Sequence, residues 1–310
     1  MVTRRTFLAA SVAGAAALAV APLRGWAQAG NGSAAASAIE KRAIPSSGQQ
    51  VPVIGMGTSG SFQVGTSQAE RDPLREVLRR FFAGGGTLID TAPSYGTAEE
   101  VVGDLLSELG LRERCFLATK LSETGRDANL AQFETSLRRL KTDKVELLQV
   151  HNLRDWRTSF GVVEALKKEG KVRYSGLTHY QDAGHAELVQ VMRETKPDFV
   201  QINYSVISRN AEREVFPVAQ ELGTAVLINR AFDDGNLFAK AGDKALPSWA
   251  AEIGATSWAQ LFLRFSLSHP AVTAVIPATG KPDRQSDNLK AGSGPRLTDA
   301  QRDELSAMFA

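Results

Sequence analysis

Short apolar runs alternate with longer amphipathic stretches through most of this chain, and this alternation constrains its fold more than any other feature. An apolar run bounded by turn residues predicts a buried strand, whereas apolar residues spaced three and four apart predict a helix. Helical spacing separates each predicted strand from the next, as in the stretch from Leu74 to Phe81. The predicted strands end near Gly57, Asp90, Lys120, His151, Thr178, Asn203, Ile228 and Ile276.

Strict alternation of this kind predicts a parallel sheet with right-handed crossovers. Eight units in a chain of 310 residues favour an α/β fold of the closed (β/α)8 TIM barrel type, with an N-terminal β-hairpin over residues 41–55. The chain is 43% hydrophobic, which is enough apolar material for a large core. The main alternative is an open doubly wound sheet of the Rossmann type. It is disfavoured because eight strand–helix units at this length fit a closed barrel better than an open sheet.

Two helix starts are predicted from capping signals. Thr97-Ala-Glu-Glu100 has the spacing of a capping box and predicts the start of the helix after Asp90. Asn129 with Gln132 predicts the start of the next helix in the same way.

Ionisable side chains stand at the ends of three successive predicted strands. Asp90 ends the second strand and Tyr95 follows in the turn, while Lys120 and His151 end the third and fourth strands. Each has a simpler explanation, as a turn residue, a surface lysine or a core histidine. However, barrel strands end on one common face, and buried ionisable groups need partners. We therefore expect these four residues to form one site.

The four residue types suit a reaction that protonates an oxygen. A phenol is a weak acid at neutral pH, but a nearby ammonium stabilises the phenolate. Lys120 would therefore assist Tyr95, Asp90 would keep Lys120 charged and oriented, and His151 would hydrogen bond to a developing oxyanion. A general acid of this kind contributes about 10²–10⁴-fold to the rate. Carbonyl reduction is such a reaction if a hydride donor lies opposite.

Several motifs, in the order in which they occur, resemble those of the aldo-keto reductase family. They are Gly55-Met-Gly57-Thr58, Asp90-Thr-Ala-Pro-Ser-Tyr95-Gly96, Thr119-Lys120, Gln149-Val-His151 and Gln201-Ile-Asn203-Tyr-Ser205. The resemblance implies an oxidoreductase that reduces aldehydes or ketones to alcohols with NADP(H), bound extended across the barrel mouth. It assigns Tyr95 as the proton donor, supported by Asp90, Lys120 and His151.

The segment after the last predicted strand is a candidate phosphate site. Lys281 and Arg284 stand near the start of a predicted helix, where backbone N–H groups favour an anion. The planar guanidinium of Arg284 suits a 2′-phosphate, although a solvated basic turn would look similar. The resemblance matches Arg284, Asp287 and Asn288 to an adenosine-phosphate motif. The complete set of predicted cofactor contacts is Gly57, Thr58, Thr178, His179, Gln201, Asn229, Arg230, Phe232, Gly235, Leu237, Ala278, Thr279, Lys281, Arg284, Asp287 and Asn288.

Three positions depart from the pattern of the family. Thr178-His179 stands where many members carry Ser-Asn, which holds the nicotinamide amide. Asn229-Arg230 stands where many members stack a tyrosine on the nicotinamide, so Arg230 is expected to stack there or to contact a phosphate. Ser59-Gly60 replaces a frequent aromatic residue. We expect these changes to alter the surroundings of the nicotinamide and the substrate but to leave the proton relay intact.

The N-terminal segment is interpreted as a twin-arginine signal peptide over residues 1–29, followed by a flexible leader over residues 30–40 and the barrel over residues 41–310. Arg4 and Arg5 precede an uncharged stretch rich in alanine and glycine, and Ala27-Gln28-Ala29 fits a cleavage site. The stretch is shorter than the roughly 20 apolar residues that span a bilayer. We expect export to the periplasm by the twin-arginine machinery without stable membrane insertion; the alternative is an uncleaved anchor.

Charge and cysteine content restrict the expected partners. The formal net charge is +2, and loss of Arg4, Arg5 and Arg24 with the signal peptide leaves −1, so no nucleic-acid partner is predicted. Cys115 is the only cysteine, which excludes an intramolecular disulfide and favours a buried, inert thiol. We assign no metal ligands and expect a small-molecule carbonyl substrate.

Two other functions are compatible with the sequence. A barrel that only binds or senses NADP(H), without catalysis, would accommodate the departures at His179 and Asn229. An aldolase-like enzyme would use Lys120 as a Schiff-base lysine, although Asp90 should keep that lysine protonated and poorly nucleophilic.

The walls of a substrate pocket are expected from three predicted loops, at residues 61–67, 153–159 and 232–247. Their aromatic residues, and those next to them, are either pocket walls or core: Phe62, Trp156, Phe160, Phe232 and Phe238.

Overall fold

The computed structural model describes residues 38–310, so the predicted signal peptide, and the predicted leader as far as residue 37, lie outside the described residues. The chain is already packed at Ile39, which contacts the hydrophobic core. The backbone N–H of Glu40 donates to the carbonyl of Gly292 at 2.8 Å. The described residues are therefore packed from just before the first strand.

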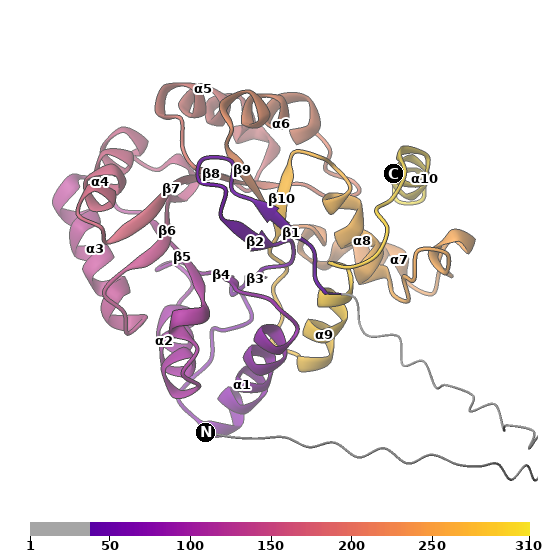
Figure 1. The fold of residues 1–310 in the computed structure, drawn as a ribbon, viewed down its shortest axis with the longest axis horizontal. Helices are drawn as coiled ribbons and strands as arrows, with labels where there is room; N and C mark the ends of the chain where they lie inside the picture. The colour runs from indigo at the N-terminus through magenta and orange to yellow at the C-terminus, as the bar shows by residue number, and fades with distance from the viewer. Residues whose placement is uncertain (1–37) are drawn as a thin grey trace, which may run out of the picture. The chain divides into compact units, whose positions relative to one another are not determined.

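Within residues 38–310, eight parallel strands form a barrel and follow one another around it in sequence order (Figure 1). The sheet closes where Ile54 pairs with Val275 and Gly57 pairs with Ala278. A methyl group on Gly57 would lie 2.8 Å from the carbonyl oxygen of Ile276, so glycine is needed at this seam. The predicted (β/α)8 barrel is thereby confirmed. Its strands are β3 (Met56–Gly57), β4 (Leu88–Asp90), β5 (Phe116–Leu121), β6 (Val145–Val150), β7 (Val172–Thr178), β8 (Phe199–Asn203), β9 (Ala225–Asn229) and β10 (Val272–Val275).

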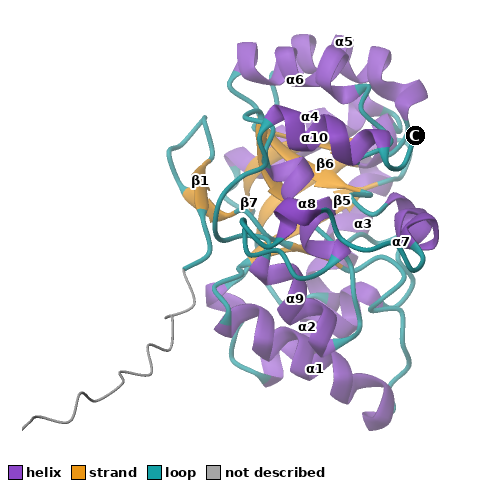
Figure 2. Ribbon diagram, turned by 90° about the vertical axis from the view of Figure 1, so that its right-hand side faces the viewer, coloured by secondary structure: helices purple, strands orange, loops and turns teal. Residues whose placement is uncertain are grey.

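Helices surround the strands (Figures 1 and 2). On the first helix, Leu74, Val77, Leu78 and Phe81 are buried at the predicted helical spacing. Burial of each such side chain contributes about 1.5–3 kcal/mol. The helices are α1 (Gln68–Ala83), α2 (Ala98–Glu108), α3 (Arg126–Arg139), α4 (Trp156–Lys168), α5 (His185–Thr195), α6 (Ala211–Leu222), α7 (Asn236–Ala241), α8 (Trp258–Leu267), α9 (Pro282–Lys290) and α10 (Asp299–Ala307).

The predicted hairpin closes one end of the barrel. Strands β1 (Lys41–Ala43) and β2 (Gln50–Pro52) pair in antiparallel fashion. Ile44 and Val51 of the hairpin join residues of the barrel interior, such as Phe116 and Phe199, in one buried cluster. In Figure 2, β1 lies at one end of the barrel and α7, which follows β9, lies at the other. The opposite mouth, where the strands end, is therefore the one left open to a ligand.

The predicted start of α2 is confirmed, with Thr97 at its N-cap, but the predicted capping box does not form, and the predicted helix start at Asn129 is wrong. The side chain of Thr97 makes no cap hydrogen bond, and its hydroxyl donates instead to the carbonyl of Val64 at 2.8 Å. Helix α3 begins at Arg126, and Asn129 is buried inside it, where its amide donates to the carbonyl of Gly125 at 3.0 Å. The amide of Asn129 also donates to Ser159 Oγ at 3.1 Å, so in both cases a contact outside the local segment engages the polar side chain.

Cys115 is buried, as predicted, and burial raises the pKa of its thiol, which makes it a poor nucleophile. Among residues 38–310, no helix combines the length and the hydrophobicity needed to cross a membrane. The same residues contain no group of three or more His, Cys, Asp or Glu side chains that could hold a metal ion.

Candidate active site

A cavity of about 1010 Å³ lies at the C-terminal mouth of the barrel. Asp90, Tyr95 and His151 line it, and they come from the ends of β4 and β6 and from the turn after β4. Segments that follow β3, β7, β9 and β10 complete the wall. The cavity is thus built at the strand ends where the sequence places its ionisable residues.

Lys120 lies behind this wall and forms a buried ion pair with Asp90. Strands β4 and β5 are neighbours, and Lys120 Nζ lies 2.6 Å from Asp90 Oδ2 and 2.8 Å from the carbonyl oxygen of Thr91. The side chains are 0% and 4% exposed. Burial alone would lower the pKa of Lys120, but its interactions with Asp90 and Tyr95 outweigh burial and raise it. Lys120 is therefore an ammonium at neutral pH.

Two glutamines hold the other oxygen of Asp90. The amide nitrogens of Gln149 and Gln201 lie 2.9 Å and 2.8 Å from Asp90 Oδ1. Gln149 is fully buried on β6, and Gln201 is nearly so on β8. These donors leave Oδ2 of Asp90 for Lys120. No role was predicted for Gln149 from the sequence, because its position beside Asp90 depends on the sheet register.

Tyr95 lines the cavity beside the ion pair. Its ring centroid is 4.9 Å from Lys120 Nζ, and the ring packs edge-on against His151 at 6.0 Å between centroids. The backbone N–H of Tyr95 donates to the carbonyl of Ala92, which fixes the turn after β4. The phenol thus reaches the cavity while its ring lies next to a positive charge.

His151 is neutral in this environment. Strand β6 ends at Val150, one residue earlier than predicted, and His151 begins the short 3₁₀ turn His151–Leu153. Burial and the Lys120 ammonium lower the pKa of His151 from its ordinary value of 6.5 to about 4, with Asp90 opposing them. Ser94 Oγ lies 3.4 Å from His151 Nδ1. If the serine hydroxyl donates to Nδ1, the ring carries its proton on Nε2 and is a hydrogen-bond donor.

The far end of the cavity is positively charged. Lys281 and Arg284 line it at the start of α9. Within the described part of the chain, no carboxylate lies within ion-pair distance of either side chain. Asp287 faces the other way, because it accepts hydrogen bonds from Ser257 Oγ at 2.5 Å and from Gln260 Nε2 at 2.6 Å. This end is suited to bind an anion.

Most of the predicted cofactor contacts come together in the wall of the cavity. Those that line it are Gly57, Thr58, Thr178, Gln201, Asn229, Arg230, Phe232, Gly235, Ala278, Thr279, Lys281 and Arg284. Those that do not are His179, Leu237, Asp287 and Asn288. Leu237 is fully buried in the hydrophobic core, and Asn288 is also buried. Their assignment as cofactor contacts stays a prediction.

The predicted aromatic walls divide between cavity and core. Phe232 and Phe238 line the cavity, whereas Phe62 and Phe160 are buried in the core. Trp156 also packs against the core. The distinction depends on the direction in which each loop turns, which spacing alone does not encode.

Arg230 is held by contacts that were not predicted from the sequence. Its Nε donates to Asp234 Oδ1 at 2.9 Å, and Nη1 donates to the carbonyl oxygen of Tyr180 at 3.1 Å. The guanidinium also lies 5.0 Å from the centroid of the Tyr180 ring. Arg230 and Asp234 both have positive φ, at 52° and 54°. The charge of Arg230 is thus balanced by Asp234, and Tyr180 is an unpredicted aromatic wall of the cavity.

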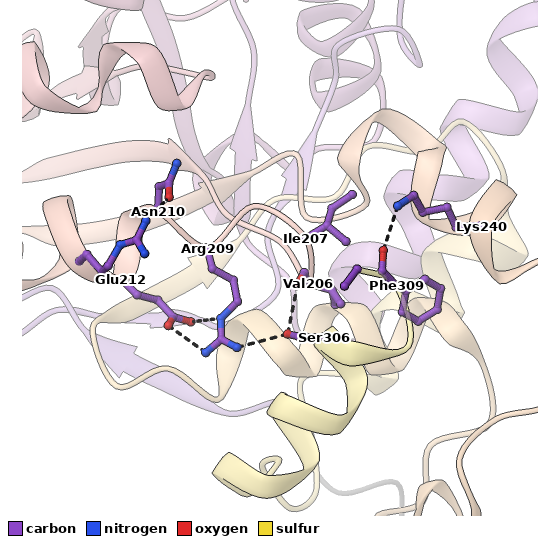
Figure 3. Close-up of a pocket in the computed structure, with 10 residues that line it drawn as sticks. Val206, Ile207, Arg209, Asn210, Glu212, Lys240, Ser306 and Phe309 are labelled. Carbon is purple, nitrogen blue, oxygen red and sulfur yellow. Dashed lines mark hydrogen bonds and ion pairs between the residues drawn. The ribbon is translucent and has the colours of Figure 1, made fainter.

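A second hollow of about 650 Å³ lies beside α6, α7 and α10 (Figure 3). Its central cation, Arg209, is bound to Glu212, Asp303 and Ser306. Lys240 donates to the carbonyl of Phe309 at 2.9 Å. These cations connect neighbouring elements, and we assign no chemistry to this hollow.

The chain is similar to known proteins over most of its length. The model of the Aldo/keto reductase family matches residues 53–309. Methylglyoxal reductase YeaE of Escherichia coli (strain K12) is 31% identical over 252 residues, which are 77% of this chain and 86% of that protein. Glyoxal reductase of Bacillus subtilis (strain 168) is 28% identical over 246 residues, which are 78% and 83% of the two chains.

Solved structures show the same similarity. The aldo/keto reductase from Klebsiella pneumoniae, crystallised in complex with NADP and acetate, aligns with a TM-score of 0.71 and 27% identity. The alignment covers 84% of this chain and 93% of that chain. The region matched by the family model contains every strand of the barrel, β3 to β10.

Proposed function

The chain belongs to the aldo/keto reductase family, and on this basis we propose the role of each residue around its cavity. The protein is an NADP(H)-dependent oxidoreductase that reduces aldehydes or ketones to alcohols. The observation that carries the residue assignment is the buried Lys120 ammonium, which lies between the Asp90 carboxylate and the ring of Tyr95.

Tyr95 is the proton donor in this proposal. Its phenol borders the cavity, and the adjacent ammonium stabilises the phenolate that remains after the proton has moved to the substrate oxygen. Asp90 keeps Lys120 charged and in place, and Gln149 and Gln201 hold Asp90. The nicotinamide, when bound, supplies the hydride that the carbonyl carbon receives.

His151 acts as a neutral hydrogen-bond donor to the carbonyl oxygen. Its lowered pKa keeps the ring uncharged at physiological pH, so it does not compete with Tyr95 as the acid. A preorganised neutral donor polarises the carbonyl and stabilises negative charge that develops on the oxygen.

The cavity residues fit NADP(H). Lys281 and Arg284 lie beside the N-terminus of α9 and have no acidic partners among residues 38–310, and a phosphate group would supply the missing negative charge. These residues would hold the 2′-phosphate end of the cofactor. The other end would lie near Thr178, Gln201 and Asn229, beside Tyr95.

We propose small α-oxoaldehydes as the first substrates to test. Two of the similar proteins are a methylglyoxal reductase and a glyoxal reductase. A second carbonyl withdraws electrons from the first and makes its carbon a better hydride acceptor. Such substrates therefore need less activation by the active site.

The proton-donor assignment is tested by Tyr95→Phe. The variant should lose about 10²–10⁴-fold in NADPH-dependent reduction of methylglyoxal, because only the transferable proton is removed. NADPH binding, followed by fluorescence titration, should be unchanged. Turnover like that of the wild type would refute the assignment of Tyr95.

We also propose that residues 1–29 direct export by the twin-arginine route to the periplasm. The support is the Arg4-Arg5 pair, the uncharged stretch after it and the Ala27-Gln28-Ala29 site. A route that carries folded proteins suits an enzyme whose cofactor is made in the cytoplasm. A route that threads an unfolded chain would lose that cofactor.

A further inference from the structure

Asn229, at the end of β9, has a buried side-chain oxygen. Within the part of the chain that the structure describes, this Oδ1 has no hydrogen-bond partner, and it is shielded from solvent although the residue lines the cavity. A buried acceptor left without a donor costs about 1–3 kcal/mol. Such a group inside a ligand cavity calls for an explanation, and a donor carried by the ligand is the simplest one.

The neighbours of Asn229 determine which end of its amide is free. Its Nδ2 lies 3.2 Å from the carbonyl oxygen of His179 and 3.4 Å from Oε1 of Gln201. Both of these atoms are acceptors, so the nitrogen must face them and the oxygen must face elsewhere. The terminal torsion of an asparagine is soft, so a small rotation can turn Oδ1 toward a ligand.

The other polar groups at this end of the cavity are already engaged. Thr178 Oγ1 accepts from the backbone N–H of Asn152 at 3.1 Å. Gln201 Oε1 accepts from Asn229 Nδ2 at 3.4 Å, and its amide nitrogen, a donor, is bound to Asp90 at 2.8 Å. An amide donor entering the cavity near Tyr95 would therefore find its free acceptor at Asn229.

His179 is turned away from this position. Its ring lies against Gly184, where a methyl group would come within 2.1 Å of the ring. Its Nδ1 is also within hydrogen-bond distance of the backbone of Gln181. His179 therefore makes no side-chain contribution to the cavity wall.

We propose that Asn229 Oδ1 accepts a hydrogen bond from the carboxamide N–H of the nicotinamide, and that this chain recognises the carboxamide from the end of β9. The inference rests on the proposed NADP(H) function. Asn229 is a positioning residue in this role, because a fixed carboxamide fixes the ring from which the hydride leaves.

The test compares three probes by binding titration, without turnover. The first is NADP⁺, and the second is its 3-acetylpyridine analogue, in which a methyl group replaces the amide NH₂. The third is 2′-phospho-ADP-ribose, which lacks the nicotinamide. Wild type is compared with Asn229→Ala and with the control Asn236→Ala, an exposed asparagine in the same connection after β9.

Wild type and the control should bind NADP⁺ about 5- to 10-fold more tightly than the acetylpyridine analogue, the effect of one neutral hydrogen bond. Asn229→Ala should bind both dinucleotides with equal, weakened affinity. All three proteins should bind 2′-phospho-ADP-ribose equally.

Three results would overturn the inference. They are discrimination that persists in Asn229→Ala, absence of discrimination in wild type, and a loss of 2′-phospho-ADP-ribose affinity in Asn229→Ala as large as the loss for NADP⁺. Failure of wild type to bind any of the probes would instead refute the cofactor assignment, and with it the proposed function.

Discussion

The amide nitrogen of Gln149 lies 2.9 Å from Oδ1 of Asp90, on the carboxylate oxygen that does not bind Lys120. Oδ1 of this carboxylate thus accepts from an amide, and Oδ2 binds the ammonium. The amide therefore keeps Oδ2 in the position from which it holds Lys120 beside Tyr95.

Gln149→Met should therefore lower kcat while leaving NADPH binding unchanged. Methionine keeps the unbranched volume that packs against Gly176, but it removes the donor to Asp90. We expect a loss of about 5- to 10-fold in kcat, corresponding to one hydrogen bond. Steady-state kinetics measures it, with Gln132→Met on α3 as a control glutamine that binds Ser122 instead. An equal loss in both variants would contradict the positioning role of Gln149.

Lys120→Met should impair reduction severely, and its effect should not add to that of Tyr95→Phe, because the two residues act as one unit. Removal of one partner of a buried ion pair costs about 3–5 kcal/mol of stability. The amides of Gln149 and Gln201 should reduce this cost by stabilising Asp90. Kinetics of the two single variants and the double variant, with urea unfolding as the control for folding, tests the coupling. Additive losses would show that Lys120 and Tyr95 act independently.

The lowered pKa of His151 predicts a loss of stability in acid. The unfolded chain takes up a proton near pH 6.5, whereas the folded chain does so only near pH 4. The unfolded state therefore binds more protons between these values, and stability falls as pH falls through that window. Urea unfolding at pH 7 and pH 5 should show a smaller decrease for His151→Gln than for wild type. Equal decreases would show that groups other than His151 cause the loss of stability in acid.

Arg284→Ala should weaken binding of NADPH much more than binding of NADH. The reason is the loss of a charge-assisted contact to the 2′-phosphate, about 1.5–3 kcal/mol or roughly 10- to 100-fold in affinity. Lys290→Ala, at the other end of α9, is the matched control and should change neither affinity. Fluorescence titration measures both cofactors. The same loss for NADH would indicate a structural role for Arg284.

Replacement of Arg4 and Arg5 by lysine should keep the protein in the cytoplasm in a folded, active form. The change preserves charge and removes only the arginine pair of the predicted signal. Fractionation of cells that carry wild type or the variant, with activity measured in each fraction, provides the test. Equal amounts of both proteins in the periplasm would show that export does not use the twin-arginine route.

The part of the site that the N-terminal half of the chain supplies could be predicted from local sequence patterns. Asp90, Lys120 and His151 were placed together because each follows a predicted strand and parallel strands end on one face of a barrel. The structure brings these residues together at the predicted mouth, with His151 one residue beyond its strand. The alternation of strand and helix was sufficient for this, since it encodes both the barrel and the direction of its strands.

The partners of these residues were decided only by the tertiary structure. Gln149 and Gln201 meet at Asp90 because barrel closure and sheet register bring β4, β6 and β8 together, and register is not written in any one segment. The same holds for Arg230, which donates to the carbonyl of Tyr180, 50 residues away in the sequence.

The sequence by itself determined the alternation of strands and helices and the strand ends at which the chemistry lies, because periodicity and composition act locally. The tertiary structure decided which polar atom meets which, including the free oxygen of Asn229 and the turned ring of His179. These hydrogen bonds join segments far apart in sequence, and each requires a donor–acceptor distance that is correct to within a few tenths of an ångström. Only the assembled barrel sets those distances.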